Sequence, residues 1–520
     1  MRLDYWNHPL IVKAIRVKYR GGKLFMLATS YLMLLLVGGM VLFHYRAAMS
    51  LKDWAQVYFV IMVSVQFVIS SIIAISSTSS SMQAEVSSRT MDFQRIATVS
   101  PLQILLGKAI GEPASSYMLA MATVPIAVFC SMLGEVSVLE VAMIYVTLAT
   151  TTLMMASLGL QHSLDPTSKG AQAGGIAGGM FFFIFVASSI PFRFGTRGGF
   201  AELVSAAIGL FTPILSIKGI AFDKANMWTD RMPFFDFELP YAILTPIAQS
   251  AMAALALLFM VRRMTQPLLT SASKLQSYAV LAVADLIWAG LEFESYKLGE
   301  GLTAPAVRFA IGHTILSMLL VSRITPNRDG FQSWAWRLRG RKQFLWDHLA
   351  GERTLNFLSL FVFCVIGVTV FCGAILVPLM ALRPNIVGLT NWSELIIASV
   401  LSILLVLCYG LFYQVLSVAM VKGAGVVLFV TSMMGMVGPF AVGVAYNLPL
   451  LSSLSPIATF IRLQDTVQPP YAPLPIFAVH SLAIVFWAWG LYGMASRTTR
   501  QVDRKLETMG VATRHMEGTQ

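Results

Sequence analysis

The sequence predicts an all-α polytopic membrane protein with about twelve transmembrane helices. Of its 520 residues, 57% are hydrophobic and only 12% are charged, and the mean hydropathy is +0.72. Soluble globular domains carry about 25% charged residues, so this composition excludes a soluble fold. The apolar residues also gather in runs of roughly 20, the length that crosses about 30 Å of hydrocarbon as a helix.

Ten apolar runs have this length, and we take them as spans in the order 24–45, 56–78, 113–134, 139–162, 173–192, 240–261, 355–380, 393–417, 425–446 and 473–495. Two further segments, 276–294 and 304–322, carry charged side chains, which are costly at the middle of a bilayer. Either both cross or neither does, because a single crossing would move the basic segment 323–353 to the opposite side. We expect both to cross, which gives twelve spans, with ten as the alternative.

The distribution of Lys and Arg predicts the orientation. With the N-terminus inside, 26 basic residues lie on the cytoplasmic side and ten lie outside, as the positive-inside rule requires. Both termini are then cytoplasmic, including a basic tail over 497–520, and no signal peptide is evident. We expect an integral protein of the bacterial inner (plasma) membrane. The net charge of +12 suits anionic lipid headgroups, so the bilayer is the expected partner and nucleic acid is not.

Three short matches indicate an internal repeat. Phe93-Gln94 matches Phe331-Gln332, Gly111-Glu112 matches Gly351-Glu352, and Thr212-Pro213-Ile214 matches Ser455-Pro456-Ile457, in that order along the chain. Their separations are nearly constant, which predicts two six-span halves in the same orientation. We place the first half at 24–264 and the second at 265–496, after an N-terminal amphipathic helix within 1–23.

A charged loop over 85–112 follows the second span. Ser100 and Pro101 predict a helix start, with Ser as the cap and Pro in the first turn. A short helix from Pro101 to about Ile110 follows, with leucines at helical spacing. Such a surface can pack on a partner, although amphipathic helices also lie at the membrane interface without one.

This loop resembles that of the permease subunits of exporter-type ABC transporters, the type V fold. In that family an elbow helix precedes the first span, and the loop after the second span carries an acidic-basic-Thr segment, Ser-Pro, a hydrophobic helix and Gly-Lys. The matching residues here are Glu85, Arg89, Thr90, Ser100, Pro101, Leu105, Gly107 and Lys108. The resemblance implies that 85–112 is a coupling helix that docks on a separate ATP-binding cassette ATPase subunit. The resemblance covers the first half of the chain well. In the second half it consists mainly of the same arrangement of spans and loops.

The chain itself is not expected to be an enzyme or to hold a cofactor. A phosphate-binding loop is absent, because Gly107-Lys108 is followed by Ala109 and no strand precedes it. ATP and magnesium are therefore expected on the partner ATPase. One permease chain with two ATPase subunits is the expected assembly, with a homodimer of the permease as the alternative. No feature of the spans selects a substrate class.

The corresponding loop of the second half, 323–353, departs from the family pattern. It lacks Ser-Pro and Gly-Lys but is rich in Trp and Arg, and its candidate coupling residues are Phe331, Trp336, Arg339, Gly351 and Glu352. It either docks on the second ATPase in another way or lies on anionic lipid.

Two other function classes remain as alternatives: a secondary active transporter and a non-transporting membrane scaffold. Ion coupling normally leaves charged residues within spans. The candidates are Asp285, Glu292, Arg308 and His313, which we expect to act structurally as partners of one another. The four cysteines all lie in apolar runs, so we interpret them as small buried hydrophobic residues and expect neither a disulfide framework nor a metal site.

Overall fold

The structure is a computed structural model that describes residues 9–45, 49–91, 100–163, 231–235, 237–266, 270–297, 303–326, 328–337, 345–351, 354, 356–382, 392–419, 474–508 and scattered positions between 427 and 460. The chain forms two compact units. The first comprises Met1–Pro233 and Phe237–Thr265, and the second comprises Phe234–Asp236 and Gln266–Gln520. The division at Thr265 lies beside the half boundary placed at 264 and 265 from the sequence.

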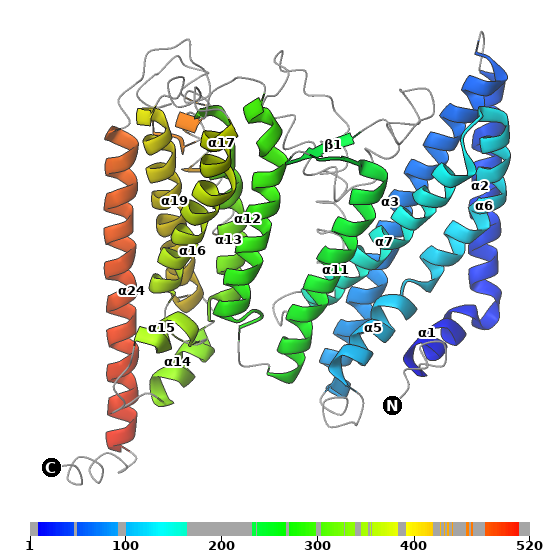
Figure 1. Cartoon of the computed structure of the whole chain (residues 1–520). Coiled ribbons are helices and arrows are strands. Elements are labelled where there is room, and N and C mark those ends of the chain that lie inside the picture. Colours follow the sequence, from blue (N-terminus) through cyan, green and yellow to red (C-terminus); the bar gives the residue numbers. More distant parts are fainter. Residues whose placement is uncertain are drawn as a thin grey trace. The chain divides into compact units, whose positions relative to one another are not determined.

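In the residues that the structure describes, the first unit is helical apart from one two-stranded sheet (Figure 1). Its elements are α1 (Pro9–Tyr19), η2 (Arg20–Gly22), α2 (Lys23–His44), α3 (Leu51–Ser87), α5 (Pro101–Gly111), α6 (Ala114–Gly134), α7 (Val138–Ser163), β1 (Arg231–Phe234), β2 (Phe237–Pro240) and α11 (Tyr241–Thr265). Phe234, the last residue of β1, and Phe235 belong to the second unit.

In the described part of the second unit, the other elements are all helices. They are α12 (Lys274–Lys297), α13 (Thr303–Ile324), α14 (Arg328–Arg337), α15 (Leu345–Ala350), α16 (Phe357–Val370), the π-helical turn η3 (Phe371–Leu376), α17 (Val377–Leu382), α19 (Trp392–Ala419) and α24 (Leu474–Thr508). The segments α16, η3 and α17 form one continuous run of 26 residues.

Among the described residues, nine helices are long and apolar enough to cross a membrane: Leu24–His44, Leu51–Ser87, Ala114–Gly134, Val138–Gln161, Tyr241–Thr265, Ala306–Ile324, Phe357–Leu382, Trp392–Ala419 and Leu474–Thr498. They confirm an all-α polytopic membrane protein. Eight of them coincide with apolar runs taken as spans from the sequence. The run 173–192 lies outside the described residues, as does 425–446 apart from scattered positions.

The ninth candidate, Ala306–Ile324, belongs to the pair of charged segments. Both segments are helical, with 24 residues in α12 and 22 in α13. At 1.5 Å per residue these lengths correspond to about 36 Å and 33 Å, enough for a bilayer. The helix α12 is not among the nine candidates, and it carries Asp285, Glu292 and Glu294.

The two units share a pattern of helix neighbours. In the first unit, α7 packs against α3, α6 and α11, while α2 packs against α3 and α6. In the second unit, α19 packs against α13, α16 and α24, while α12 packs against α13 and α16. Taken in chain order, α2, α3, α6, α7 and α11 thus correspond to α12, α13, α16, α19 and α24.

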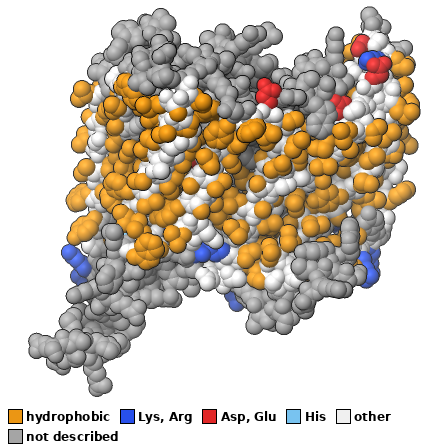
Figure 2. Space-filling model, viewed as in Figure 1, with side chains coloured by type: hydrophobic (Ala, Val, Ile, Leu, Met, Phe, Trp, Pro, Cys, Tyr) orange, Lys and Arg blue, Asp and Glu red, His pale blue; other side chains and the backbone are white. Residues whose placement is uncertain are grey.

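Hydrophobic side chains cover the flanks of the helices in the face shown in Figure 2, and the charged side chains visible there lie near the helix ends. Such a distribution fits a lipid environment, in which an apolar surface needs no protein partner. Each unit also has its own apolar core. A large cluster in the first unit joins α2, α3, α6 and α7 around Phe59 and Phe67, and one in the second joins α12, α13 and η3 around Phe309 and Phe371.

Candidate functional site

The loop that follows the second span of the first unit begins at the end of α3. This helix has 37 residues, about 55 Å, so it extends well beyond the roughly 30 Å of hydrocarbon that a span needs. Arg89, just after its end, has a left-handed backbone with φ of 57°, which is uncommon for a residue other than glycine. The side chains of Arg89 and Thr90 are exposed. The hydroxyl of Thr90 lies 3.0 Å from that of Ser88 and donates to the Glu85 carbonyl oxygen at 3.3 Å.

The predicted helix of the loop is confirmed as α5, which begins at Pro101 and ends at Gly111, one residue beyond the expected end. A capping box starts it. The Ser100 hydroxyl accepts from the Gln103 amide at 3.2 Å, and the Gln103 side-chain oxygen accepts from the Ser100 amide at 3.1 Å. These bonds satisfy two backbone donors that the first turn leaves without helical partners.

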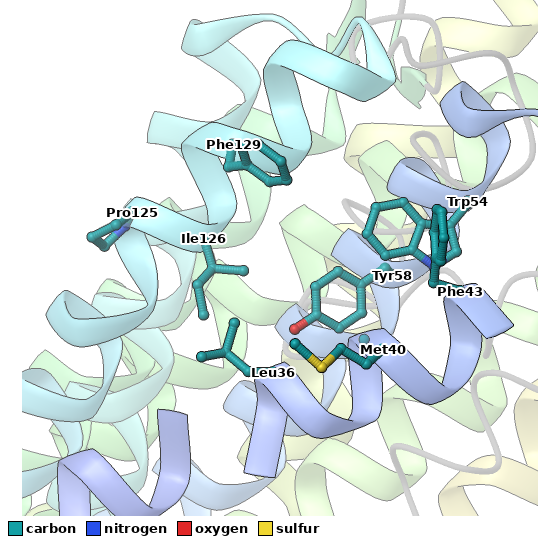
Figure 3. A pocket seen from close by; sticks show the side chains of 9 residues that line it. Leu36, Met40, Phe43, Trp54, Tyr58, Pro125, Ile126 and Phe129 are labelled. Carbon is teal, nitrogen blue, oxygen red and sulfur yellow. The ribbon is translucent and has the colours of Figure 1, made fainter. Parts of the chain in front are cut away.

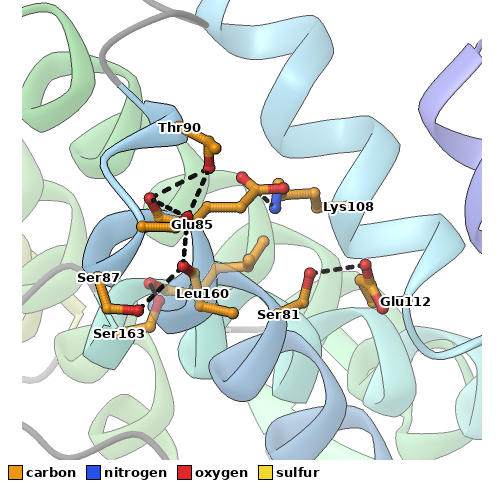
Figure 4. A network of polar contacts seen from close by, with 10 residues as sticks. Ser81, Glu85, Ser87, Thr90, Lys108, Glu112, Leu160 and Ser163 are labelled. Carbon is orange, nitrogen blue, oxygen red and sulfur yellow. Dashed lines mark hydrogen bonds and ion pairs between the residues drawn. The ribbon is translucent and has the colours of Figure 1, made fainter.

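An ion pair fixes α5 to the end of α3. Lys108 Nζ lies 2.6 Å from Glu85 Oε2, and the Lys108 side chain is only 4% exposed (Figure 4). A buried ammonium requires a nearby negative charge, because desolvation of an isolated cation is costly. Glu85 and Lys108 were each predicted from the sequence as coupling residues, and the structure brings them together.

A second polar group ties α5 to both α3 and α1. Glu112, directly after α5, accepts from the Ser81 hydroxyl at 2.7 Å (Figure 4) and lies 3.6 Å from Lys18 Nζ. Burial lowers the pKa of Lys18, and the charge of Glu112 opposes this shift. The backbones of α1 and α5 meet at Gly111, where an added Cβ would lie 3.1 Å from Ala14 Cβ and 3.2 Å from Ile11 Cα. Glycine at this position permits the close approach.

The apolar side of α5 packs into the first unit. Ile104, Leu105 and Ala109 are buried, and they join side chains of α3, α7 and α11 in one cluster with Met82, Leu160 and Met260 among its members. In the first turn of the helix, Leu102 is 46% exposed. The helix therefore has an exposed first turn, followed by a largely buried remainder.

The predicted coupling residues of the first unit differ in their exposure to solvent. Arg89, Thr90 and Ser100 are exposed, and Pro101 is half-buried. Leu105, Gly107 and Lys108 are buried, and Glu85 is half-buried beneath the turn. Sequence reasoning missed Ser81 and Lys18 as anchors of the loop, because both act through contacts distant in the chain.

The loop of the second unit is built from α14 and α15. Phe331 is 1% exposed in α14, and Trp336 lies in the same helix with its side chain outside the described part. Gly351 follows α15, and its carbonyl oxygen accepts from the Thr354 hydroxyl at 2.8 Å. Arg339 and Glu352 lie outside the described residues.

A buried lysine contacts this second loop, and the sequence did not predict its role. Lys274, the first residue of α12, donates from Nζ to the His348 carbonyl oxygen and to the Thr354 hydroxyl, both at 2.7 Å. Burial lowers its pKa to about 7. The Tyr278 hydroxyl, one turn further on, donates to the Leu349 carbonyl oxygen at 3.0 Å. These contacts hold α15 against the start of α12.

Four charged residues within α12 and α13, namely Asp285, Glu292, Arg308 and His313, are paired with one another, as predicted. Arg308 Nε donates to Glu292 Oε2 at 2.9 Å, and His313 Nδ1 lies 2.8 Å from Asp285 Oδ2. None of the four residues is more than 5% exposed. Each pair joins the two neighbouring helices through the interior of the second unit.

One apolar pocket of about 430 Å³ lies among α2, α3 and α6 of the first unit. Figure 3 shows Leu36, Met40 and Ile126 around the Tyr58 ring, with Phe129 nearby. The Tyr58 hydroxyl donates to the Leu35 carbonyl oxygen at 2.8 Å, so its polar atom is already bonded. Within the described part of the chain, no group of three or more His, Cys, Asp or Glu could hold a metal ion.

Comparison of the chain with protein-family models, with curated proteins and with solved structures gives no match. The function is therefore argued from the geometry of the two units. The loop over α5 is the best-defined polar site at a helix end in the first unit, and the paired charges of α12 and α13 are the best-defined polar site within the second.

Proposed function

We propose that the chain is the membrane-spanning permease subunit of an exporter-type ABC transporter, with ATP hydrolysed by a separate subunit. The observation that carries the proposal is the construction of the loop after α3. An exposed turn at Arg89 and Thr90 stands beside a capped helix that is held by Glu85, Lys108 and Glu112. A docking surface must transmit force into the spans, and this loop is joined to α1 and α3 by ion pairs and to α3, α7 and α11 by packing.

We propose about twelve spans arranged as two parallel six-span repeats. The shared helix neighbours of the two units support this arrangement, as does the helical form of both α12 and α13. Ten spans would result if α12 and α13 did not cross. The membrane is proposed to be a bacterial inner membrane with both termini cytoplasmic, on the charge distribution given above.

The proposed roles differ among the residues of the first loop. Arg89, Thr90 and Ser100 are exposed and would contact the ATPase directly, with Leu102 adding apolar surface. The buried residues of α5 would transmit its displacement to α3 and α11; they are Leu105, Gly107 and Lys108. In the second loop, Phe331 is buried and would act in the same indirect way. Trp336, Arg339, Gly351 and Glu352 complete the proposed second docking region.

The experiment is purification of the tagged chain from its own host in mild detergent, with the ATPase activity of the eluate and the identity of co-purifying subunits measured. We expect an ATP-binding cassette subunit in the eluate and ATPase activity that depends on the permease. Arg89→Gln should reduce this stimulation at least about tenfold, as loss of an interfacial charge contact of about 1.4 kcal/mol would. Arg16→Gln, an exposed arginine in α1 outside the loop, is the matched control. A permease that carries no such ATPase at any step of purification contradicts the proposal.

A secondary active transporter is the second candidate, and one observation favours it: the charged residues buried within α12 and α13. Such residues mark ion pathways in many transporters. Transport that persists in vesicles without ATP and follows an imposed ion gradient would favour this candidate. The permease proposal expects no such transport.

A further inference from the structure

We propose that Asp285 and His313 form a proton-binding site inside the second unit, independent of the function proposed above. The bound proton makes the pair an imidazolium and a carboxylate, which together have no net charge. The site is built from α12 and α13, and α16 closes it at Gly367.

The geometry of the pair is that of a charge-assisted hydrogen bond. His313 Nδ1 and Asp285 Oδ2 are 2.8 Å apart, within the range of about 2.7–2.9 Å for a cationic donor and a carboxylate. Asp285 is 0% and His313 5% exposed. Without the proton, the pair would leave one net negative charge in an interior that water does not solvate.

The surroundings supply little else to compensate that charge. Asp285 Oδ1 has no hydrogen-bond partner among the described residues, so His313 is the donor that the carboxylate depends on. The other ring nitrogen of His313, Nε2, lies 3.4 Å from the Ser317 hydroxyl, a long and weak contact. The positive charge of protonated His313 is therefore compensated mainly by Asp285.

Packing holds the imidazole in place. An added Cβ at Gly367 of α16 would lie 2.6 to 2.8 Å from three atoms of the His313 ring, so the backbone of α16 touches the ring directly. The Phe309 ring lies nearly parallel to it, at 10° and with centroids 6.4 Å apart. A ring confined in this way cannot turn away from Asp285 when its charge changes.

The other ionisable groups nearby do not replace the proton. Arg308 is engaged with Glu292, seven residues and about 10 Å along α12 from Asp285. The described parts of the elements packed on α12 and α13 carry, as further titratable side chains, Cys364, Cys372, Glu394, Cys408, Tyr409, Tyr413 and His348, with Lys274 and Tyr278 at the start of α12 and Arg323 at the end of α13. Of these, Lys274 and Tyr278 donate to carbonyl oxygens of α15, and Lys274 donates also to the Thr354 hydroxyl.

Proton release would then loosen the second unit. The negative charge would stand among the apolar side chains of α12, α13 and η3, including Ala289, Phe309 and Phe371. A buried charge that has lost its partner is unfavourable, so loss of the proton should weaken the packing around the pair. The pair would therefore link the packing of α12, α13 and α16 to pH.

The test is nitrogen NMR of the full chain labelled at histidine, in lipid nanodiscs, between about pH 6 and about pH 9.5. The chain has seven histidines, and His313→Gln assigns the relevant signal by its loss. We expect His313 to carry protons on both ring nitrogens in the wild type and on one ring nitrogen in Asp285→Asn at the same pH.

His480 is the internal control. It is 6% exposed in α24, and its Nδ1 hydrogen-bonds to the Ile476 carbonyl oxygen at 2.9 Å, so Asp285→Asn should not change its signal. A His313 signal that stays neutral over the whole range in the wild type overturns the proposal without any variant of Asp285. So does a wild-type titration that is unchanged in Asp285→Asn.

Discussion

The two units pair their helices in the same order but use different polar groups to do so. In the described spans of the first unit, neutral side chains make buried polar contacts, such as Gln249 with Thr150 and Thr151, and Thr123 with Tyr145. Its ion pairs with Lys18 and Lys108 lie at the loop end, beside α5. The second unit places two ion pairs inside its spans.

This difference shows that the helix order alone does not determine how each unit is stabilised. Interhelical hydrogen bonds between neutral groups in membranes contribute about 0.6 kcal/mol each. A buried ion pair contributes little net energy, but the loss of one partner is severe. The first unit is thus tolerant within its spans and sensitive at its loop, while the second is sensitive within its spans.

The largest effect is expected at Arg308. Arg308→Met removes the cation that faces Glu292 in the second unit and should destabilise the protein by about 3–5 kcal/mol. The double variant with Glu292→Leu should recover most of this loss, because it removes both charges. Thermal unfolding in nanodiscs measures both, with Gln249→Leu of the first unit as the comparison. Equal losses in the single variants of the two units would remove the contrast between them.

The next largest effect is expected at Lys108, a buried charge of the first unit. Lys108→Met should cost about 2–3 kcal/mol, less than Arg308→Met because Glu85 is partly exposed and keeps some solvation. Hydrogen exchange should rise in α5 and at the end of α3, while the spans of the first unit keep their protection. Faster exchange throughout α6 and α7 would show that the loop pair stabilises the whole unit.

The smallest effect is expected at Ser100. Ser100→Ala removes the capping box of α5 and should cost about 1 kcal/mol, seen as faster exchange in the first turn of that helix. Ser100→Gly, which keeps a backbone that caps tolerate, should cost only a few tenths of that. No change in exchange for Ser100→Ala would mean that packing of Leu105 and Ala109 alone orders the helix.

Local signals in the sequence were sufficient for some of these features. The bounds of α5 were predicted to within one residue, because Ser100 and Pro101 act on the turn that follows them directly. The pairing of the charges in α12 and α13 was also predicted, since buried charges on adjacent spans have few other ways to be compensated.

Other features depend on contacts that no local pattern reveals. The burial of Lys108 follows from its contact with Glu85 on another helix, and a Gly-Lys pair looks the same whether it faces a partner or the interior. The contact of α1 with α5 requires Gly111 to meet Ala14, a pairing that neither segment shows by itself. No local pattern marks the role of Lys274, because its Nζ bonds to groups 74 and 80 residues later in the chain.

The contact between α1 and α5 also constrains how the protein is made. Lys18 and Glu112 are 94 residues apart (112 minus 18), and α2 and α3 lie between them in the chain. At a synthesis rate of about 5–20 residues per second, α1 waits about 5–20 s before the ribosome supplies the helix that covers its face of Leu10, Ile11 and Ala14. During that interval the nascent N-terminus must rest on lipid or on a chaperone, so the order of assembly is set by the timing of translation.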